Sequence, residues 1–136
     1  MYTDKKYKGI IVPAVTPLTK DYTIDTAAVE KIFASFYEHN ISPFILGTTG
    51  ESASLSASVK TDYLKAAEKN KKTGTVLYAG ISSNVFAESV EFAKLCADNA
   101  VDAVAATLPS YYALNDGQML KYFEGLAGAI PLPMII

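Results

Sequence analysis

The chain lacks tryptophan and arginine, and its 136 residues include one cysteine and one histidine. The lone Cys96 has no partner for an internal disulfide, and no pairing of Cys and His has the spacing of a zinc site. The longest apolar runs, such as 101–108, are far shorter than the roughly 20 residues of a membrane-spanning helix. We therefore expect no disulfide scaffold, no metal site and no insertion into a membrane.

The charge is nearly balanced, because 12 basic residues face 14 acidic ones for a net charge of −2. The basic residues form no stripe, which excludes nucleic acid as an expected partner. The opening MYTDKKYKG lacks the apolar run of a signal peptide, so the cytoplasm is the expected location. A composition of 50% hydrophobic and 19% charged residues is typical of one globular domain.

Short apolar runs alternate with longer stretches of helical spacing, which predicts an α/β fold. The runs are nearly continuous in apolar residues, as in a parallel sheet covered on both faces. The expected strands are 9–15, 43–47, 75–80, 102–108 and 132–136. Small polar residues that can cap a helix precede the stretches between them, namely Asp25, Ser56 and either Ser83 or Asn84.

The last expected strand, 132–136, is followed by no helix. A doubly wound domain usually closes with a helix over its last strand, and a complete (β/α)₈ barrel needs roughly 200 to 250 residues. The sequence therefore leaves two interpretations, a small α/β protein or about half of a barrel.

Ligands of parallel α/β folds bind beyond the carboxyl ends of the strands, so the loops there are the candidate sites. The loop GTTGES at 47–52 has two glycines for close backbone approach and two hydroxyls beside N–H groups. Such a loop suits a carboxylate or an oxyanion, although it can also be a turn whose threonines cap the next segment. It lacks the Gly-x-x-x-x-Gly-Lys pattern of a nucleotide phosphate site.

Two further loops follow expected strands. The segment PSYY at 109–112 places tyrosines where one can donate a hydrogen bond to an oxyanion or pass on a proton. With nine tyrosines in the chain, the pair can equally seal a barrel mouth or an interface. The segment GISSN at 80–84 is read as a helix cap.

Several motifs together resemble the dihydrodipicolinate synthase and N-acetylneuraminate lyase family. They are VPAVTP at 12–17, GTTGES at 47–52, Ala79-Gly80 with Asn84, PSYY at 109–112 and PMII at 133–136. The resemblance implies the N-terminal half of a (β/α)₈ barrel, with strands 1 to 5 and four intervening helices. Residues 1–136 are then one partial-barrel domain that stops within its fifth strand.

The resemblance also implies an activity. The family consists of class I aldolases, usually homotetramers, which bind pyruvate as a Schiff base on a lysine and join it to, or release it from, an aldehyde. It implies no metal or organic cofactor. Thr48 matches the hydroxyl of the family's proton relay, and Thr49 matches the residue that holds the pyruvate carboxylate with the loop N–H groups of Gly47 and Gly50.

Two further roles are implied by position. Tyr111 falls on the relay tyrosine that in the synthases reaches into a neighbouring subunit's site, with Tyr112 as the alternative. Asn84 and Glu88 fall where lysine-inhibited synthases bind their feedback inhibitor, which makes them an expected allosteric site.

This sequence also departs from the family. In the family, the strand starting at Pro133 continues into a Tyr-Asn pair whose tyrosine moves protons, and the Schiff-base lysine stands on the following strand. The lysines here read as terminal, loop or helix-surface residues, including the helix end at 69–72, and none ends an expected strand. We expect that residues 1–136 alone form no pyruvate adduct, because such a lysine normally stands at a strand end, partly desolvated.

The aldehyde substrate is left open. SASL at 52–55 is similar to the dihydrodipicolinate synthases, which use pyruvate and aspartate semialdehyde. Ala113-Leu114 lacks the polar and basic residues frequent there, which suits lyases of 2-keto-3-deoxy sugar acids or of sialic acid.

The alternative to an enzyme is a non-catalytic half-barrel that associates with itself or another chain to cover two strand edges and an apolar face. In either case we expect the isolated chain to be oligomeric or poorly soluble.

Three single residues receive structural roles. His39 is predicted to cap the end of a helix, and Cys96 to be buried as a small hydrophobe. Glu51 is predicted to bond loop N–H groups rather than act as a general base.

Overall fold

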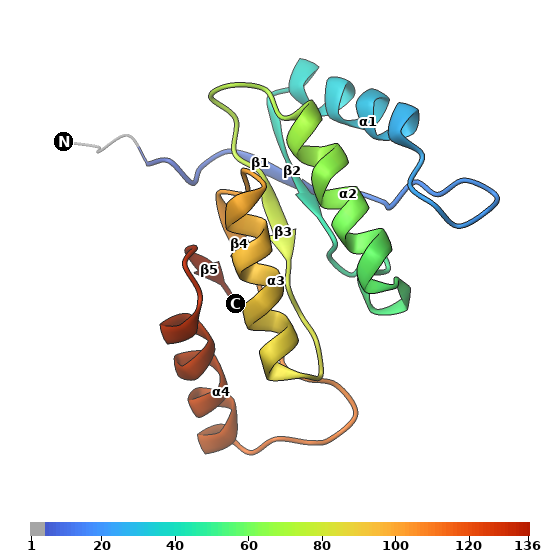
Figure 1. The fold of residues 1–136 in the computed structure, drawn as a ribbon. Coiled ribbons are helices and arrows are strands. Elements are labelled where there is room, and N and C mark those ends of the chain that lie inside the picture. The colour runs from blue at the N-terminus through green and yellow to red at the C-terminus, as the bar shows by residue number, and fades with distance from the viewer. Residues whose placement is uncertain (1–4) are drawn as a thin grey trace.

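Five parallel strands form one sheet in the computed structural model, which describes residues 5–136 (Figure 1). The strands are β1 (Ile10–Pro13), β2 (Ile41–Ile45), β3 (Tyr78–Gly80), β4 (Ala103–Ala105) and β5 (Met134–Ile135). The helices are α1 (Thr26–Glu38), α2 (Ala57–Asn70), α3 (Phe86–Asp98) and α4 (Asp116–Ala129), with a short 3₁₀ helix, η1, at Ser52–Ser54. The predicted alternation of five strands and four helices is confirmed.

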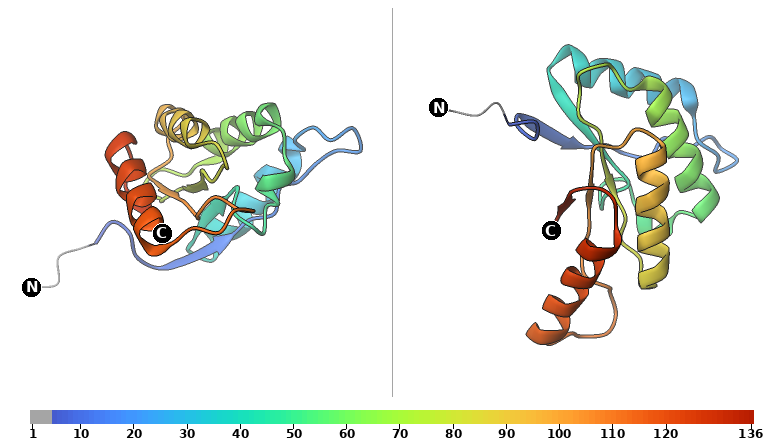
Figure 2. Two further views of the ribbon diagram at one scale, coloured as in Figure 1. Left: turned by 90° about the horizontal axis from the view of Figure 1, so that it is seen from below. Right: turned by 60° about the vertical axis from the view of Figure 1, so that its left-hand side comes forward.

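The strand order decides between the two expected architectures. Each strand pairs in parallel with the next one along the chain, in the order β1-β2-β3-β4-β5. A doubly wound sheet needs a reversal of strand order, whereas consecutive right-handed crossovers place every helix on one face. Figure 2 shows the helices as an arc on one side of the sheet. The described chain therefore has the architecture of half of a (β/α)₈ barrel, as the resemblance implies for its N-terminal half, and not that of a small doubly wound α/β protein.

The strands are shorter than the apolar runs that predicted them. The run 102–108 gives only three residues of β4, and the run 9–15 gives four residues of β1. Apolar residues continue past the hydrogen-bonded ladder, since Ala14, Leu46 and Val101 are buried outside the strands. Burial thus extends into the loops, and the apolar pattern overestimates the length of the ladder.

Two of the predicted helix caps are confirmed, and the third is wrong. The side chains of Asp25 and Ser56 accept hydrogen bonds from the third residue after them, at 3.0 and 3.3 Å. The N-cap of α3 is Val85, which has no capping side chain. Asn84 is directed elsewhere, because its Oδ1 accepts a hydrogen bond from the backbone N–H of Ser110 at 2.7 Å.

The core lies between the helices and the helix-facing side of the sheet. It includes Val29 and Phe33 of α1, Leu64 of α2, and Ile45 and Val104 of the sheet. Burying such side chains contributes roughly 1.5–3 kcal/mol each. No helix within residues 5–136 combines the length and apolarity needed to cross a bilayer.

The structural roles predicted for His39 and Cys96 are confirmed. His39 is the C-cap of α1, and its Nδ1 lies 2.8 Å from the carbonyl oxygen of Ser35. Cys96 is fully buried in α3, and burial raises the pKa of its thiol to about 12. Cys96 is therefore a packing residue of the core.

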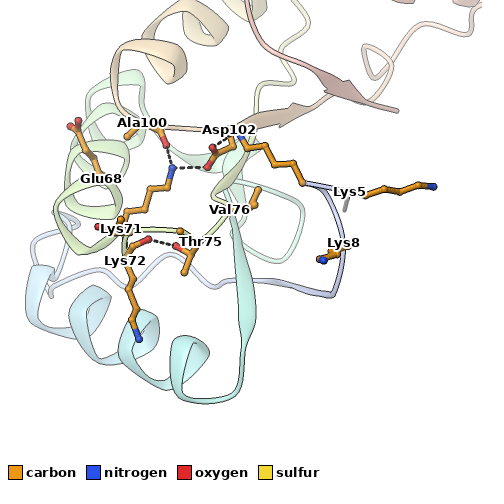
Figure 3. A pocket seen from close by; sticks show the side chains of 12 residues that line it. Lys5, Lys8, Glu68, Lys71, Lys72, Thr75, Val76, Ala100 and Asp102 are labelled. Atoms are coloured by element: carbon orange, nitrogen blue, oxygen red, sulfur yellow. Dashed lines mark hydrogen bonds and ion pairs between the residues drawn. The ribbon is translucent and has the colours of Figure 1, made fainter. Parts of the chain in front are cut away.

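At the amino-terminal ends of the strands, one carboxylate ties three segments together (Figure 3). Asp102 Oδ2 lies 2.6 Å from Lys71 Nζ and 2.9 Å from the N–H of Leu77, and its Oδ1 lies 2.8 Å from Lys6 Nζ. We call these four residues the Asp102 cluster. The prediction of a solvated end for α2 is therefore wrong at Lys71, which also donates to the carbonyl of Ala100 at 2.7 Å.

Candidate functional site at the carboxyl ends of the strands

Three loops meet at the carboxyl ends of β2, β3 and β4. They enclose an open hollow of about 1200 Å³. Its polar lining includes hydroxyl, amide and carboxylate groups from the loops and the first turns of α2 and α3. Among these residues are Thr48, Glu51, Ser82, Asn84, Thr107 and Ser110. This is the edge of a parallel sheet at which barrel enzymes bind their ligands.

The loop at 47–52 has a conformation that non-glycine residues rarely adopt. Leu46, just before it, has φ +58°, and Glu51, near its end, has φ +52°. Each left-handed residue of this kind costs roughly 1–2 kcal/mol. The loop is closed internally by hydrogen bonds from Gly50 N–H to Gly47 O at 3.1 Å and from Glu51 N–H to Thr48 O at 2.9 Å. Such a conformation persists only where the surrounding structure imposes it.

Two close approaches impose this conformation. A Cβ added to Gly80 would lie 2.1 Å from the carbonyl oxygen of Leu46, so the backbone at the end of β3 lies directly against the start of the loop. On the other side, the Thr16 hydroxyl donates a 2.7 Å hydrogen bond to Gly50 O. A Cβ on Gly50 would lie 3.1 Å from that hydroxyl and from Ala14 O. The loop is thus held between β3 and the segment that follows β1.

The loops after β3 and β4 are joined to each other. The N–H of Thr107 donates to Ser82 Oγ at 2.9 Å, and both the N–H and the hydroxyl of Ser110 lie within 3.1 Å of Asn84 Oδ1. The Ser83 hydroxyl in turn donates to Glu88 at 2.6 Å. Asn84 therefore fixes the residue immediately before Tyr111.

The structure brings together some of the predicted site residues and not others. Gly47 and Thr48 line the hollow, and so do Asn84 and Glu88. Thr49 is exposed and lies outside the lining, and Gly50 is buried behind the loop.

The tyrosines that follow β4 also lie outside the hollow. Tyr111 is 90% exposed with φ +81°, and Tyr112 is 79% exposed. Their rings contact each other edge to face at 4.9 Å. Within the described chain, therefore, Tyr111 faces solvent rather than Thr48.

Sequence reasoning missed or misplaced three features of the site. The sequence marks Thr16 only as part of the VPAVTP motif, although its hydroxyl holds the loop. Lys60, at the start of α2, lines the hollow and is half-buried, whereas the sequence predicts a terminal, loop or helix-surface position for it. Glu51 is exposed, and its side chain does not cap η1, so the structure gives the predicted bonding to loop N–H groups no support.

A second hollow, of about 530 Å³, lies at the opposite ends of the strands beside the Asp102 cluster. Five lysines line it, but the ammonium groups of Lys6 and Lys71 form ion pairs with Asp102. Figure 3 shows the side chains of Lys5 and Lys72 pointing away from that carboxylate. The lysines therefore do not converge on a common point. In residues 5–136 no group of three metal-ligating side chains gathers either.

Comparison with known proteins identifies the family. The profile of the Dihydrodipicolinate synthetase family matches residues 6–136. The chain belongs to this family. Membership extends over every strand and helix described above, including the loops that form the larger hollow.

Individual members of the dihydrodipicolinate synthetase family are similar to this chain over nearly all of its length. The 4-hydroxy-tetrahydrodipicolinate synthase of Methanosarcina mazei is 34% identical over 131 residues, which are 96% of this chain and 44% of that protein. The structure of dihydrodipicolinate synthase from Bacteroides thetaiotaomicron matches with a TM-score of 0.87 and 34% identity, covering 93% of this chain and 43% of the other.

A lyase structure matches equally well. The N-acetylneuraminate lyase of Mycoplasma synoviae has a TM-score of 0.86 and 32% identity, covering 96% of this chain and 46% of that one. The chain thus spans less than half the length of the relatives it matches. The relatives include both synthases and lyases.

Proposed function

We propose that this chain supplies the carboxylate-binding and proton-relay part of a pyruvate-dependent lyase of the aldolase type, which forms a Schiff base with its substrate. The observation that carries the proposal is the hollow at the carboxyl ends of β2 to β4, with Gly47 and Thr48 in its lining, in a chain of this family. Loop N–H groups and hydroxyls at such a position suit a carboxylate and a developing oxyanion.

In the proposed reaction, Thr48 passes protons and the loop of Gly47, Thr49 and Gly50 holds the pyruvate carboxylate, as the family resemblance implies. In the described chain only Gly47 of these three lines the hollow, so the proposal requires the carboxylate to bind on the side of the loop where Thr49 is exposed. Tyr111 completes the relay, with Tyr112 as the alternative. The exposure of Tyr111 supports a role in the site of a neighbouring subunit, as in the homotetramer that the resemblance implies. Residues 1–136 then form one partial-barrel domain of the whole enzyme.

We further propose that the amine of the Schiff base lies outside residues 1–136. All 12 lysines fall within the described chain, and none stands at the carboxyl end of a strand. An amine attacks a keto group only in its uncharged form, which a partly desolvated strand end favours and a solvated surface does not. Lys60 lines the hollow from the first turn of α2, so it is the lysine to examine first.

For the aldehyde, we propose aspartate semialdehyde, as in the synthases. The segment 52–55 supports this choice, and the Methanosarcina mazei relative is a synthase. Cleavage of N-acetylneuraminate is the second candidate, favoured by the likeness to the Mycoplasma synoviae lyase, and a 2-keto-3-deoxy sugar acid is a third substrate of the same kind.

Asn84 and Glu88 are proposed as an effector site beside the loop that carries Tyr111.

The test is reductive trapping with pyruvate and borohydride, followed by intact mass and peptide mapping. Two samples are compared, the chain alone and a fusion in which it is followed by the C-terminal part of the Methanosarcina mazei relative. We expect one reduced pyruvate per fusion chain and none on residues 1–136. An adduct on Lys60 or another lysine of this chain contradicts the placement of the amine. A fusion that is folded by circular dichroism but gains no adduct contradicts the activity.

Threonine variants of the fusion test the assigned roles. Thr48→Val is expected to slow turnover by about 100-fold or more, because it removes a proton-transfer group. Thr49→Val is expected to raise KM for pyruvate more than it lowers kcat. Thr75→Val is the matched control, because Thr75 lies at the opposite ends of the strands and, within residues 5–136, its hydroxyl donates to Lys72 O at 2.6 Å. Equal effects of all three variants contradict the site.

A further inference from the structure

The loop at 47–52 depends on the segment that follows β1, through the hydrogen bond from the Thr16 hydroxyl to Gly50 O. After β1, the N–H of Ala14 still donates to Phe44 O at 2.8 Å, but Val15 and Thr16 lie beyond the strand pairing. Thr16 nevertheless has to stay within 2.7 Å of Gly50 O for the loop to keep its strained conformation. Further along the chain, Pro17 O accepts a hydrogen bond from Asp25 N–H at 3.0 Å, and Leu18 bridges to Ile24, so the segment is held on that side by the start of α1.

Between β1 and Pro17, the segment is held by α2. Tyr63 is fully buried, and its hydroxyl donates a 2.9 Å hydrogen bond to the carbonyl oxygen of Val15. The two residues are 48 positions apart, so the bond fixes the end of β1 against a helix that lies behind the loop. Burial raises the pKa of the Tyr63 phenol, which therefore remains a hydrogen-bond donor throughout the physiological pH range.

We propose that Tyr63 is a positioning residue for the carboxylate-binding loop, acting through Val15, Thr16 and Gly50. The inference rests on the function proposed above for that loop. Tyr63 does not line the hollow, so it acts only through the segment it holds. A tyrosine is required rather than a phenylalanine of the same shape, because only the hydroxyl reaches the Val15 carbonyl.

A matched pair of variants separates positioning from packing. Tyr63→Phe removes a bonded buried hydroxyl. Tyr37→Phe removes a buried hydroxyl that has no hydrogen-bond partner in the described chain, and it serves as the control. Thr16→Val breaks the next bond of the same series while leaving Tyr63 in place.

The first readout is hydrogen exchange measured by mass spectrometry on residues 1–136, which tolerates association between chains. In Tyr63→Phe and Thr16→Val, we expect a peptide spanning 46–52 to exchange about five- to tenfold faster than in the unaltered chain, with little change in a peptide spanning 101–106. Tyr37→Phe should leave the ratio of the two peptides unchanged. Uniform acceleration of every peptide, or an unchanged 46–52 peptide in Tyr63→Phe, overturns the proposal.

The second readout uses the fusion chain and pyruvate. We expect Tyr63→Phe to raise KM for pyruvate about threefold or more while kcat changes less, and the double variant with Thr16→Val to be no worse than the poorer single variant. Independent, multiplying effects contradict a shared route. If the unaltered fusion shows no activity, the proposed function fails, while the exchange result still decides whether Tyr63 positions the loop.

Discussion

Removing the Asp102 carboxylate should destabilise the end of the half-barrel opposite the candidate site. Asp102→Asn keeps the shape of the side chain but leaves Lys71 without its 2.6 Å ionic partner, and it weakens the bond from Leu77 N–H. The side chains of Asp102 and Lys71 are 14% and 18% exposed, between the surface and fully buried extremes. We expect a loss of about 2–3 kcal/mol in the free energy of unfolding.

The individual lysines should differ in a predictable order. Lys71→Met should cost about 2 kcal/mol, because its ammonium is largely enclosed and also bonds Ala100 O. Lys6→Met should cost less than about 1 kcal/mol, since that side chain is 58% exposed. Lys72→Met, which removes a charge from the same hollow without touching Asp102, is the control and should change stability by less than about 0.5 kcal/mol.

The pH dependence of the free energy of unfolding follows from the lowered pKa of Asp102. Burial acts to raise the pKa of Asp102, but hydrogen bonds from Lys6, Lys71 and Leu77 N–H outweigh it and hold the pKa below the ordinary 3.8. A carboxyl group with a lowered folded-state pKa stabilises the protein above its unfolded pKa and loses this contribution as the pH falls through the folded one. The stability gap between the parent chain and Asp102→Asn should therefore be constant from pH 6 to 8 and narrow below pH 3.8.

The assay is urea unfolding at one fixed chain concentration, followed by far-ultraviolet circular dichroism. A cycle with the Lys71→Met and Asp102→Asn variants isolates the coupling between them. An Asp102→Asn chain as stable as the parent at pH 7, or a gap that widens as the pH falls, would refute the reasoning.

Two further predictions concern packing. Gly80→Ala should destabilise the chain by about 3 kcal/mol, because the added Cβ would meet the Leu46 carbonyl. Gly128→Ala in α4 should be neutral or stabilising by up to about 1 kcal/mol, because nothing lies within 4 Å of the added Cβ. Thermal unfolding of the two variants checks the difference. Cys96 should not react with a thiol reagent at pH 8 until urea unfolds the chain, since burial raises the pKa of its thiol to about 12; rapid labelling of the folded chain would contradict this.

The features that could be predicted from the sequence are those set by near neighbours in the chain. Asp25 caps α1 by accepting a hydrogen bond from the N–H three residues further on, and the apolar run at 43–47 supplies most of a buried strand. Both features depend on local spacing. The GTTGES loop was recognisable because two glycines and two hydroxyls follow a strand directly. The half-barrel architecture followed from the family resemblance, because the local spacing left a small α/β protein equally open.

The features that could not be predicted depend on distant partners. Asn84 looked like a cap, but its oxygen serves Ser110, 26 residues later. Lys71 looked solvated, but its partner Asp102 is 31 residues away. Tyr63 is one of nine tyrosines, and nothing in its local spacing marks the hydroxyl that reaches back to Val15.

The consecutive strand order also has a consequence for how the chain folds during synthesis. Each strand pairs with the one made just before it, with register separations such as Ile10 to Ile41 and Tyr78 to Ala103, so the sheet can grow strand by strand as the chain emerges from the ribosome. The Tyr7 hydroxyl is an exception, since it donates to Asp102 O across 95 residues at 3.2 Å. That bond can form only after Asp102 has been made, so the segment around Tyr7 is fastened long after it has been synthesised.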